Sequence, residues 1–127
     1  MPAILYYVSG HGFGHARRCA ETIKLLKQRR PDIQVHVRTM ANPDVFAGCD
    51  VNHKPVPIDR GAVEIDALTI DWRATLSNVR ELMAQKDRLI SDEANYIREQ
   101  RVKLIIADVP FMAGYVAERA GVAANIE

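Results

Sequence analysis

Ser9-Gly10-His11-Gly12-Phe13-Gly14-His15 is the stretch that decides the fold of this chain, because it joins an apolar segment to a helical one. The preceding run, Ala3–Val8, is short, apolar and rich in β-forming residues, as in a strand covered on both faces. Residues 16–30, which follow, have the pattern of a helix. The glycines therefore form the turn at the carboxyl end of a strand, where open parallel α/β sheets bind their ligands.

Segments with the patterns of strands and helices alternate along the rest of the chain, as in a parallel sheet with crossover helices. Residues 33–39 alternate apolar and polar side chains, and this period of two predicts a strand nearer the sheet edge, with His36 on the surface. The remaining expected elements are strands over residues 51–56, 102–107 and 122–126, and a helix over residues 111–120.

Residues 62–109 contain neither Gly nor Pro, which predicts one long amphipathic helix or two nearly collinear ones. Asp71 is the expected N-cap or first-turn acid. The acidic residues from 92 to 99 are expected to form a solvated face, and Trp72 and Tyr96 to belong to the core or an interface. The apolar stripe consists of Trp72, Leu76, Val79, Met83, Ile90, Ala94 and Ile97.

Composition indicates one domain over residues 1–127, with 48% hydrophobic and 26% charged residues. No apolar run approaches the roughly 20 residues that span a bilayer, and Met1-Pro2 leads into the first strand without a secretory signal, so a cytoplasmic location is predicted. A net charge of +1, from 17 basic and 16 acidic residues, does not indicate a basic surface that would bind the backbone of a nucleic acid. Cys19 and Cys49 are expected to be reduced thiols.

The glycine loop predicts a site for an anion such as phosphate. Gly10, Gly12 and Gly14 let the backbone approach a ligand, and the helix that follows presents unpaired N–H groups and the positive end of its dipole. Arg17 and Arg18 lie in the first turn of that helix, where positive charge is unfavourable by up to roughly 1 kcal/mol. A bound phosphate or carboxylate would offset this cost; alternatively, one arginine lies along the surface and the other pairs with a nearby acid.

The spacing of the loop argues against the familiar nucleotide sites. It is Gly-x-Gly-x-Gly rather than Gly-x-Gly-x-x-Gly, and Arg38-Thr39-Met40 ends the second strand without the acid that holds a ribose, which disfavours NAD and FAD. The Gly-Lys-Ser/Thr ending of a P-loop is absent. Two glycines separate His11 from His15 and no third ligand is suitably spaced, so neither a metal nor a cofactor is predicted.

His15 and Asp108 form the candidate catalytic pair. Val8-Ser9 and Ala107-Asp108 end two strands that we expect to be neighbours where the strand order reverses. A carboxylate bonded to one imidazole nitrogen fixes the tautomer and leaves the other nitrogen free to accept a proton from a hydroxyl. Such a base contributes on the order of 10²–10⁴ in rate. In the alternative, His15 caps the helix and packs, while Asp108 accepts hydrogen bonds from backbone N–H groups.

Several stretches of the chain resemble the N-terminal domain of GT-B glycosyltransferases. The sequence is similar to predicted bacterial glycosyltransferases with a GHGFGHATR-like loop and to the N-terminal segment of plant arabinose kinases, although Arg17 stands where that pattern has Thr. The stretches that carry the resemblance are Tyr7-Val8-Ser9-Gly10-His11-Gly12-Phe13-Gly14-His15-Ala16-Arg17-Arg18, Ile106-Ala107-Asp108-Val109-Pro110 and Ala120-Gly121-Val122.

This resemblance implies a Rossmann-like, acceptor-side domain, with helices on both faces of a parallel sheet. In related plant and antibiotic sugar transferases, a His after the first strand deprotonates the acceptor hydroxyl and an Asp after a later strand orients it. His15 and Asp108 match those positions. The residues expected to face the acceptor or the diphosphate of a nucleotide-sugar donor are Gly10, His11, Gly12, Phe13, Gly14 and Arg18.

GT-B enzymes place the donor mainly in a second Rossmann-like domain, and this chain ends at Glu127. We therefore expect an incomplete N-terminal domain that is inactive alone. It would belong to a longer enzyme or be the acceptor subunit of a split two-chain transferase; the alternative is a non-catalytic phosphosugar-binding or assembly module. An incomplete sheet leaves an unpaired edge, which favours a homodimer or a domain swap.

Overall fold

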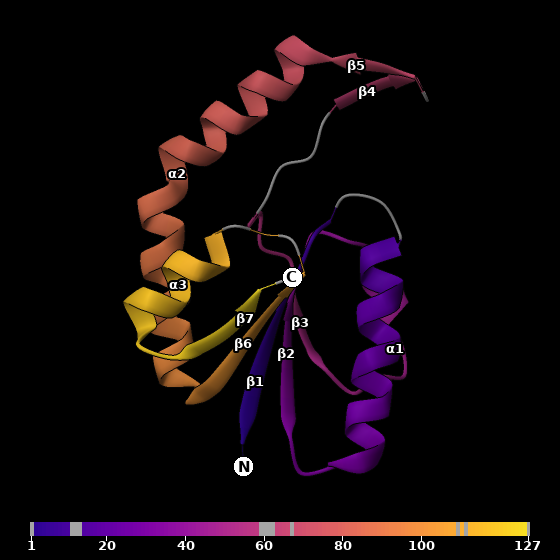
Figure 1. The fold of residues 1–127 in the computed structure, drawn as a ribbon, viewed down its shortest axis with the longest axis vertical. Coiled ribbons are helices and arrows are strands. Elements are labelled where there is room, and N and C mark those ends of the chain that lie inside the picture. Colours follow the sequence, from indigo (N-terminus) through magenta and orange to yellow (C-terminus); the bar gives the residue numbers. More distant parts are fainter. Residues whose placement is uncertain are drawn as a thin grey trace.

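A five-stranded parallel sheet forms the centre of the molecule, in the order β3-β2-β1-β6-β7 (Figure 1). The computed structural model describes residues 2–10, 14–58, 63–66, 68–108, 110 and 112–126. The strands of this sheet are β1 (Ala3–Val8), β2 (Gln34–Arg38), β3 (Asn52–Lys54), β6 (Val102–Asp108) and β7 (Ala123–Ile126). The Rossmann-like α/β class expected from the sequence is confirmed.

Helices cover both faces of the sheet (Figure 1). Helix α1 (Gly14–Arg29) packs on one face, near the short 3₁₀ helix η1 (Pro43–Phe46). Helices α2 (Trp72–Glu99) and α3 (Met112–Ala120) pack on the other. The chain runs outward from β1 to β3 and then returns to the opposite side of β1 as β6. The strand order therefore reverses between β1 and β6.

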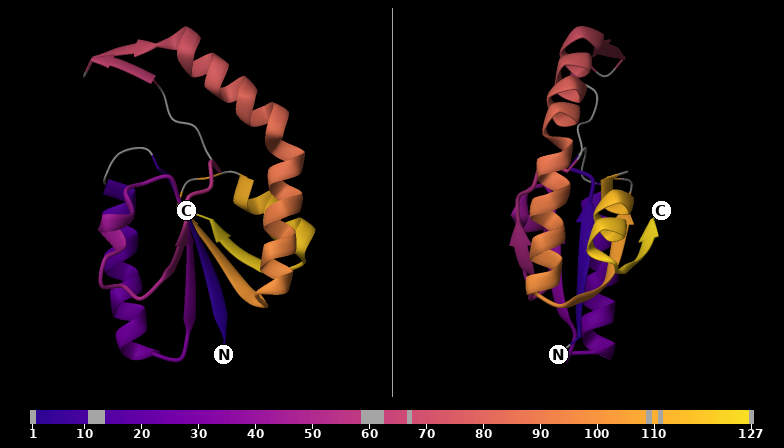
Figure 2. Two further views of the ribbon diagram at one scale, coloured as in Figure 1. Left: turned by 180° about the vertical axis from the view of Figure 1, so that it is seen from behind. Right: turned by 90° about the vertical axis from the view of Figure 1, so that its left-hand side faces the viewer.

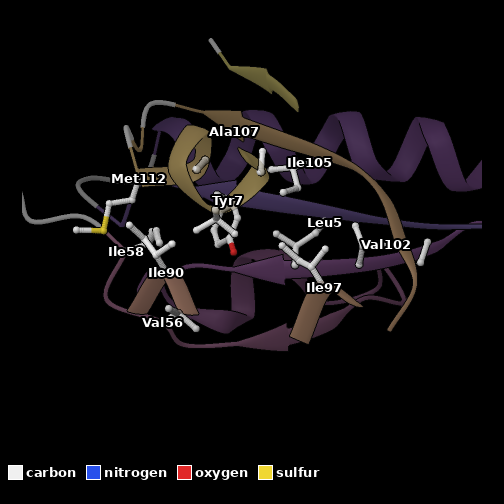
Figure 3. Close-up of a cluster of buried hydrophobic side chains, with 14 of the residues drawn as sticks. Leu5, Tyr7, Val56, Ile58, Ile90, Ile97, Val102, Ile105, Ala107 and Met112 are labelled. Atoms are coloured by element: carbon white, nitrogen blue, oxygen red, sulfur yellow. The ribbon is translucent and has the colours of Figure 1, made fainter. Parts of the chain in front are cut away.

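Strand β1 is buried along its whole length, as its apolar sequence predicts. Successive side chains alternate between the faces of a strand. Leu5 and Tyr7 accordingly lie in the core beneath α2 and α3, as Figure 3 shows, while Tyr6 and Val8 pack with Ile23 of α1. Each face of the sheet has its own hydrophobic cluster, and β1 contributes to both.

The segment before α2 is a β-hairpin, which the absence of Gly and Pro from residues 62–109 did not predict. Strands β4 (Val63–Asp66) and β5 (Thr69–Asp71) pair antiparallel, and the Asp66 carboxylate accepts a hydrogen bond from the Leu68 N–H at 2.8 Å in the turn. An Asx interaction of this kind makes a turn without Gly or Pro. The predicted cap is confirmed, since Asp71 Oδ1 accepts from the Ala74 N–H at 3.0 Å.

The apolar stripe of α2 is buried over only half of the helix. Ile90, Ala94 and Ile97 are buried, and Ile90 and Ile97 belong to the hydrophobic cluster on this face of the sheet. The N-terminal half extends beyond the sheet together with the β4–β5 hairpin, as both views in Figure 2 show, and Trp72 there is 65% exposed. Trp72 therefore does not belong to the core of this chain. None of the helices in the described ranges is long and apolar enough to cross a membrane.

Two polar residues of β2 are buried, so the prediction of a surface His36 is wrong. The strand lies between β1 and β3 and is nearer the sheet edge than β1, as predicted, but His36 and Arg38 have almost no exposed surface. Their side chains share the α2 face of the sheet with Tyr7, where packing excludes water. The alternating buried side chains of β2 therefore lie in two different environments, one apolar and one polar.

Glu93 of α2 balances the charge of Arg38, which corrects the prediction of a solvated acidic face. The Arg38 Nε lies 3.3 Å from Glu93 Oε1, and the Tyr7 hydroxyl donates to the same oxygen at 2.9 Å. The Arg38 guanidinium also stacks 3.7 Å from the centre of the Tyr96 ring, and the Tyr96 hydroxyl lies 2.6 Å from His36 Nδ1. We call Tyr7, His36, Arg38, Glu93 and Tyr96 the buried polar cluster.

Candidate functional site

The carboxyl ends of β1 and β6 meet where the strand order reverses, as the sequence predicts. Val8 pairs with Asp108 in the parallel ladder, and the Ser9 N–H donates to the Asp108 carbonyl at 3.2 Å. In doubly wound sheets, ligands bind at this switch point. The register between the two strands thus fixes Asp108 beside the first turn of α1.

His15 lies in that first turn and contacts the Asp108 side chain. Its Nδ1 is 3.2 Å from Asp108 Oδ1, and the side chains of His15 and Asp108 are 37% and 5% exposed. Because an ionised carboxylate only accepts hydrogen bonds, Nδ1 carries the proton in this contact. The Nε2 of the neutral ring then has a free lone pair. The structure therefore brings the predicted pair into direct contact.

Two further side chains of α1 bind the other carboxylate oxygen. Arg18 Nη2 donates to Asp108 Oδ2 at 2.7 Å, and the Cys19 thiol donates to the same oxygen at 3.5 Å. Arg18 Nη2 is also 3.5 Å from His15 Nδ1, but with Nδ1 protonated these two groups are neighbouring donors. The carboxylate that offsets the charge of Arg18 near the helix N-terminus is thus Asp108. We call His15, Arg18, Cys19 and Asp108 the Asp108 cluster.

The Asp108 cluster lowers the pKa of its carboxyl group below the ordinary value of 3.8. Burial acts in the opposite direction and raises this pKa, but the hydrogen bonds from Arg18, His15 and Cys19 together outweigh it. The carboxylate is therefore ionised at neutral pH and remains a hydrogen-bond acceptor for His15.

Two of the loop glycines lie within the described residues. A Cβ on Gly10 would lie 3.0 Å from the Met40 Cβ and 3.4 Å from the Ala41 nitrogen, so the close approach of the segment after β2 favours glycine there. Gly14 begins α1, and a Cβ there would meet nothing within 4 Å. The predicted substrate-facing residues His11, Gly12 and Phe13 lie outside the described residues.

Cys19 was not predicted as a site residue, although the sequence held a signal for it. Residues three and four apart lie on the same face of a helix. His15, Arg18 and Cys19 have this spacing, so a helix starting at the glycine loop aims all three at one neighbour. Within the described part of the chain, no group of three or more His, Cys, Asp or Glu side chains is arranged to hold a metal ion.

The fold resembles solved glycosyltransferase structures. A UGT transferase from Siraitia grosvenorii in complex with UDP has a TM-score of 0.63 at 17% identity, and MurG from Acinetobacter baumannii has 0.64 at 14%. The matches cover 98% and 99% of this chain, but 27% and 35% of those chains. At this level of identity the likeness concerns the fold, which is that of an N-terminal GT-B domain.

A sequence relative and a family model extend the comparison. L-arabinokinase from Arabidopsis thaliana is 33% identical over 123 residues, which are 92% of this chain and 12% of that protein. The chain thus spans a small part of the relative's length. The family model described as glycosyl transferase family 1 matches residues 2–124, nearly the whole sequence. On this match, together with the GT-B fold, the chain belongs to glycosyl transferase family 1.

Proposed function

We propose that this chain is the acceptor-binding half of a nucleotide-sugar-dependent glycosyltransferase, in which His15 is the general base and Asp108 orients it. The observation that carries the proposal is the contact between His15 Nδ1 and Asp108 Oδ1 at the switch point of the sheet. This contact leaves Nε2 on a side chain that is 37% exposed, where an acceptor hydroxyl can reach it.

In the proposed reaction, His15 Nε2 accepts the proton of the acceptor hydroxyl as its oxygen attacks the anomeric carbon of the donor sugar. A new carbon–oxygen bond forms, and the bond from that carbon to the nucleotide diphosphate breaks, with its electron pair leaving on the diphosphate. Asp108, ionised and held by three donors, stabilises the imidazolium that results. A single displacement of this kind inverts the anomeric configuration.

The substrates are expected near the N-terminus of α1. The positive end of the helix dipole favours an anionic group such as the donor diphosphate. Gly10, His11, Gly12, Phe13, Gly14 and Arg18 remain the residues proposed to face the substrates. We propose that a second Rossmann-like domain, in the same protein or in a partner chain, holds the nucleotide.

The test is the activity of His15→Ala in the transferase assembled from this domain and its donor-binding domain. We expect kcat to fall by about 10²–10⁴, the usual contribution of a general base. Arg17→Ala is the matched control, because Arg17 is an exposed residue of the same helical turn. Unchanged turnover in His15→Ala would contradict the proposal.

The name of the sequence relative favours one alternative. A segment 33% identical to this chain occurs in a protein named as a sugar kinase, so a non-catalytic module that binds phosphosugars or serves assembly is the second candidate. Titrating the chain with UDP-sugars and with phosphorylated sugars, while following the His15 ring by NMR, separates the two. Binding of phosphorylated sugars alone, with no transferase activity in the assembled protein, would support the module.

The exposed edge of the sheet supports a homodimer or a domain swap. All four residues of β7 are exposed, and the strand pairs with β6 on one side within the described residues. Such an edge offers unpaired N–H and C=O groups to a second chain. Light scattering should show a dimer, and a monomer at high concentration would contradict this proposal. A cytoplasmic location also remains a proposal.

A further inference from the structure

The two oxygens of the Asp108 carboxylate have different partners. Oδ1 contacts the ring of His15, while Oδ2 accepts hydrogen bonds from the guanidinium of Arg18 and the thiol of Cys19. All three partners lie on one face of α1, and the carboxylate is 95% buried at the end of β6. Its orientation is therefore set by the helix that also carries the proposed base.

The two donors to Oδ2 differ in strength and in exposure. The hydrogen bond from Arg18 is short, at 2.7 Å, and joins opposite charges, but the Arg18 side chain is 62% exposed. The bond from Cys19 is long, at 3.5 Å, and thiols are weak donors, but the Cys19 side chain is buried in the core beneath α1. A strong but exposed partner and a weak but buried partner thus hold the same oxygen.

We infer that Arg18 and Cys19 are positioning residues, which together hold Oδ2 of Asp108 so that Oδ1 alone sets the tautomer and orientation of the His15 ring. Without them, the carboxylate can rotate about its terminal torsion, which is a broad one. At intermediate torsion angles neither oxygen would lie within hydrogen-bonding distance of the ring, so the ring would lose its fixed partner. The role of these residues in catalysis rests on the proposed function, whereas their effect on the geometry of Asp108 does not.

This inference replaces the substrate-facing role proposed above for Arg18 with a positioning role on Asp108. A substrate-binding arginine and a positioning arginine predict different kinetics. Loss of ground-state binding raises KM and leaves kcat unchanged, whereas loss of alignment lowers kcat. Whether the replacement of Arg18 changes kcat or KM therefore decides between the two roles.

The structural test uses the chain itself, labelled with ¹⁵N in histidine and ¹³C in aspartate. In Arg18→Ala, we expect a smaller population of the Nδ1–H tautomer of His15 at alkaline pH and an upward shift of the Asp108 carboxyl titration. Cys19→Ala should change both signals in the same direction by less, and Cys19→Ser, which retains a donor, should restore them. Relative to Arg18→Ala, Arg18→Lys should restore the Asp108 carboxyl titration more fully than the tautomer population of His15. Lysine keeps the positive charge but lacks the planar guanidinium that donates from fixed positions.

Two controls match the two positions. Arg17→Ala removes the adjacent arginine, and Cys49→Ala removes the other buried thiol, which contacts the Ala20 carbonyl and not Asp108. Neither control should move the His15 or Asp108 signals. If Arg18→Ala moves them no more than Arg17→Ala does, the inference is wrong. Because Arg18 is mostly exposed, this variant should fold even if Cys19→Ala does not.

The kinetic test uses the assembled transferase. We expect Arg18→Ala to lower kcat roughly 10-fold to 100-fold, as small misplacements of catalytic groups do, with KM changed by less than about twofold. A raised KM with unchanged kcat would instead assign Arg18 to substrate and overturn the inference. If His15→Ala has full activity, the proposed function fails, yet the NMR result still decides how Asp108 is held.

Discussion

The Asp108 cluster and the buried polar cluster lie on opposite faces of one sheet, with Asp108 at the end of β6 and Arg38 at the end of β2, on either side of β1. Each combines a histidine, an arginine and a carboxylate. In the buried polar cluster, Arg38 and Glu93 are almost fully enclosed, and α2 covers them. In the Asp108 cluster the carboxylate is equally enclosed, but His15 and Arg18 reach the surface.

This difference in exposure separates a structural role from a chemical one. The ring of His36 is fully buried and its Nδ1 is occupied by the Tyr96 hydroxyl, so no substrate can reach it. The ring of His15 contacts a buried acid through Nδ1, and the side chain is 37% exposed. Similar residue types therefore hold α2 on the sheet in one place and supply the proposed proton acceptor in the other.

The largest expected effect on stability is the loss of Glu93. Glu93→Ala leaves the buried charge of Arg38 without its partner, which costs about 3–5 kcal/mol in the free energy of unfolding. Urea denaturation of the chain measures this. Asp92→Ala is the matched control, because Asp92 is the preceding, exposed residue and its ion pair with Arg88 at 3.9 Å is a surface one; it should change stability by less than about 0.5 kcal/mol. If the two variants lost equal amounts of stability, Glu93 would not be stabilising the buried charge of Arg38.

A smaller effect is expected at the glycine that precedes the Asp108 cluster. Gly10→Ala places a Cβ against Met40, and such overpacking costs roughly 1–3 kcal/mol. The same substitution at Gly14 meets open space and should be tolerated, as thermal unfolding of both variants can show. If Gly14→Ala were the more damaging change, the close approach at Gly10 would not explain the glycine.

The smallest effect is a dependence of stability on pH through His36. Burial, and then the charge of Arg38, lower the pKa of His36 below its ordinary value of 6.5. The unfolded chain therefore binds the proton more readily, and stability falls as the pH drops below that value. Urea unfolding at about pH 7 and about pH 5 should show this loss.

His36→Asn should make that pH dependence shallower, because asparagine keeps an acceptor for the Tyr96 hydroxyl but does not titrate. Part of the slope should remain, since burial and Arg38 also lower the pKa of His53. A variant with the full wild-type slope would show that His36 is not the group responsible. The Asp108 carboxyl contributes only in stronger acid, where stability is lost as the pH falls below 3.8.

The sheet and the candidate pair could be predicted because their signals are local. Each local pattern predicts a single type of structure. This holds for the apolar run of Ala3–Val8, for the glycine turn and for the strand that ends at Asp108. Topology then brings His15 and Asp108 together, because parallel strands around a switch point end at the same edge. The Asp71 cap was predictable for the same reason.

The missed features depend on packing partners that no local pattern identifies. The alternation in β2 was interpreted as half exposure, but Glu93, 55 residues away in the chain, makes a buried Arg38 tolerable. Glu93 itself looks like any acid on a helix surface until its partner is known. The β4–β5 hairpin was missed because an aspartate side chain makes its turn in place of Gly or Pro.

The central claim, that His15 acts as a base through its bond to Asp108, is tested most directly by a double-mutant cycle on kcat in the assembled transferase. Residues that act as a unit have strongly non-additive effects. Asp108→Asn should therefore lower kcat by about 10-fold or more when His15 is present, and by almost nothing in the His15→Ala background. An equal loss in both backgrounds would contradict the account.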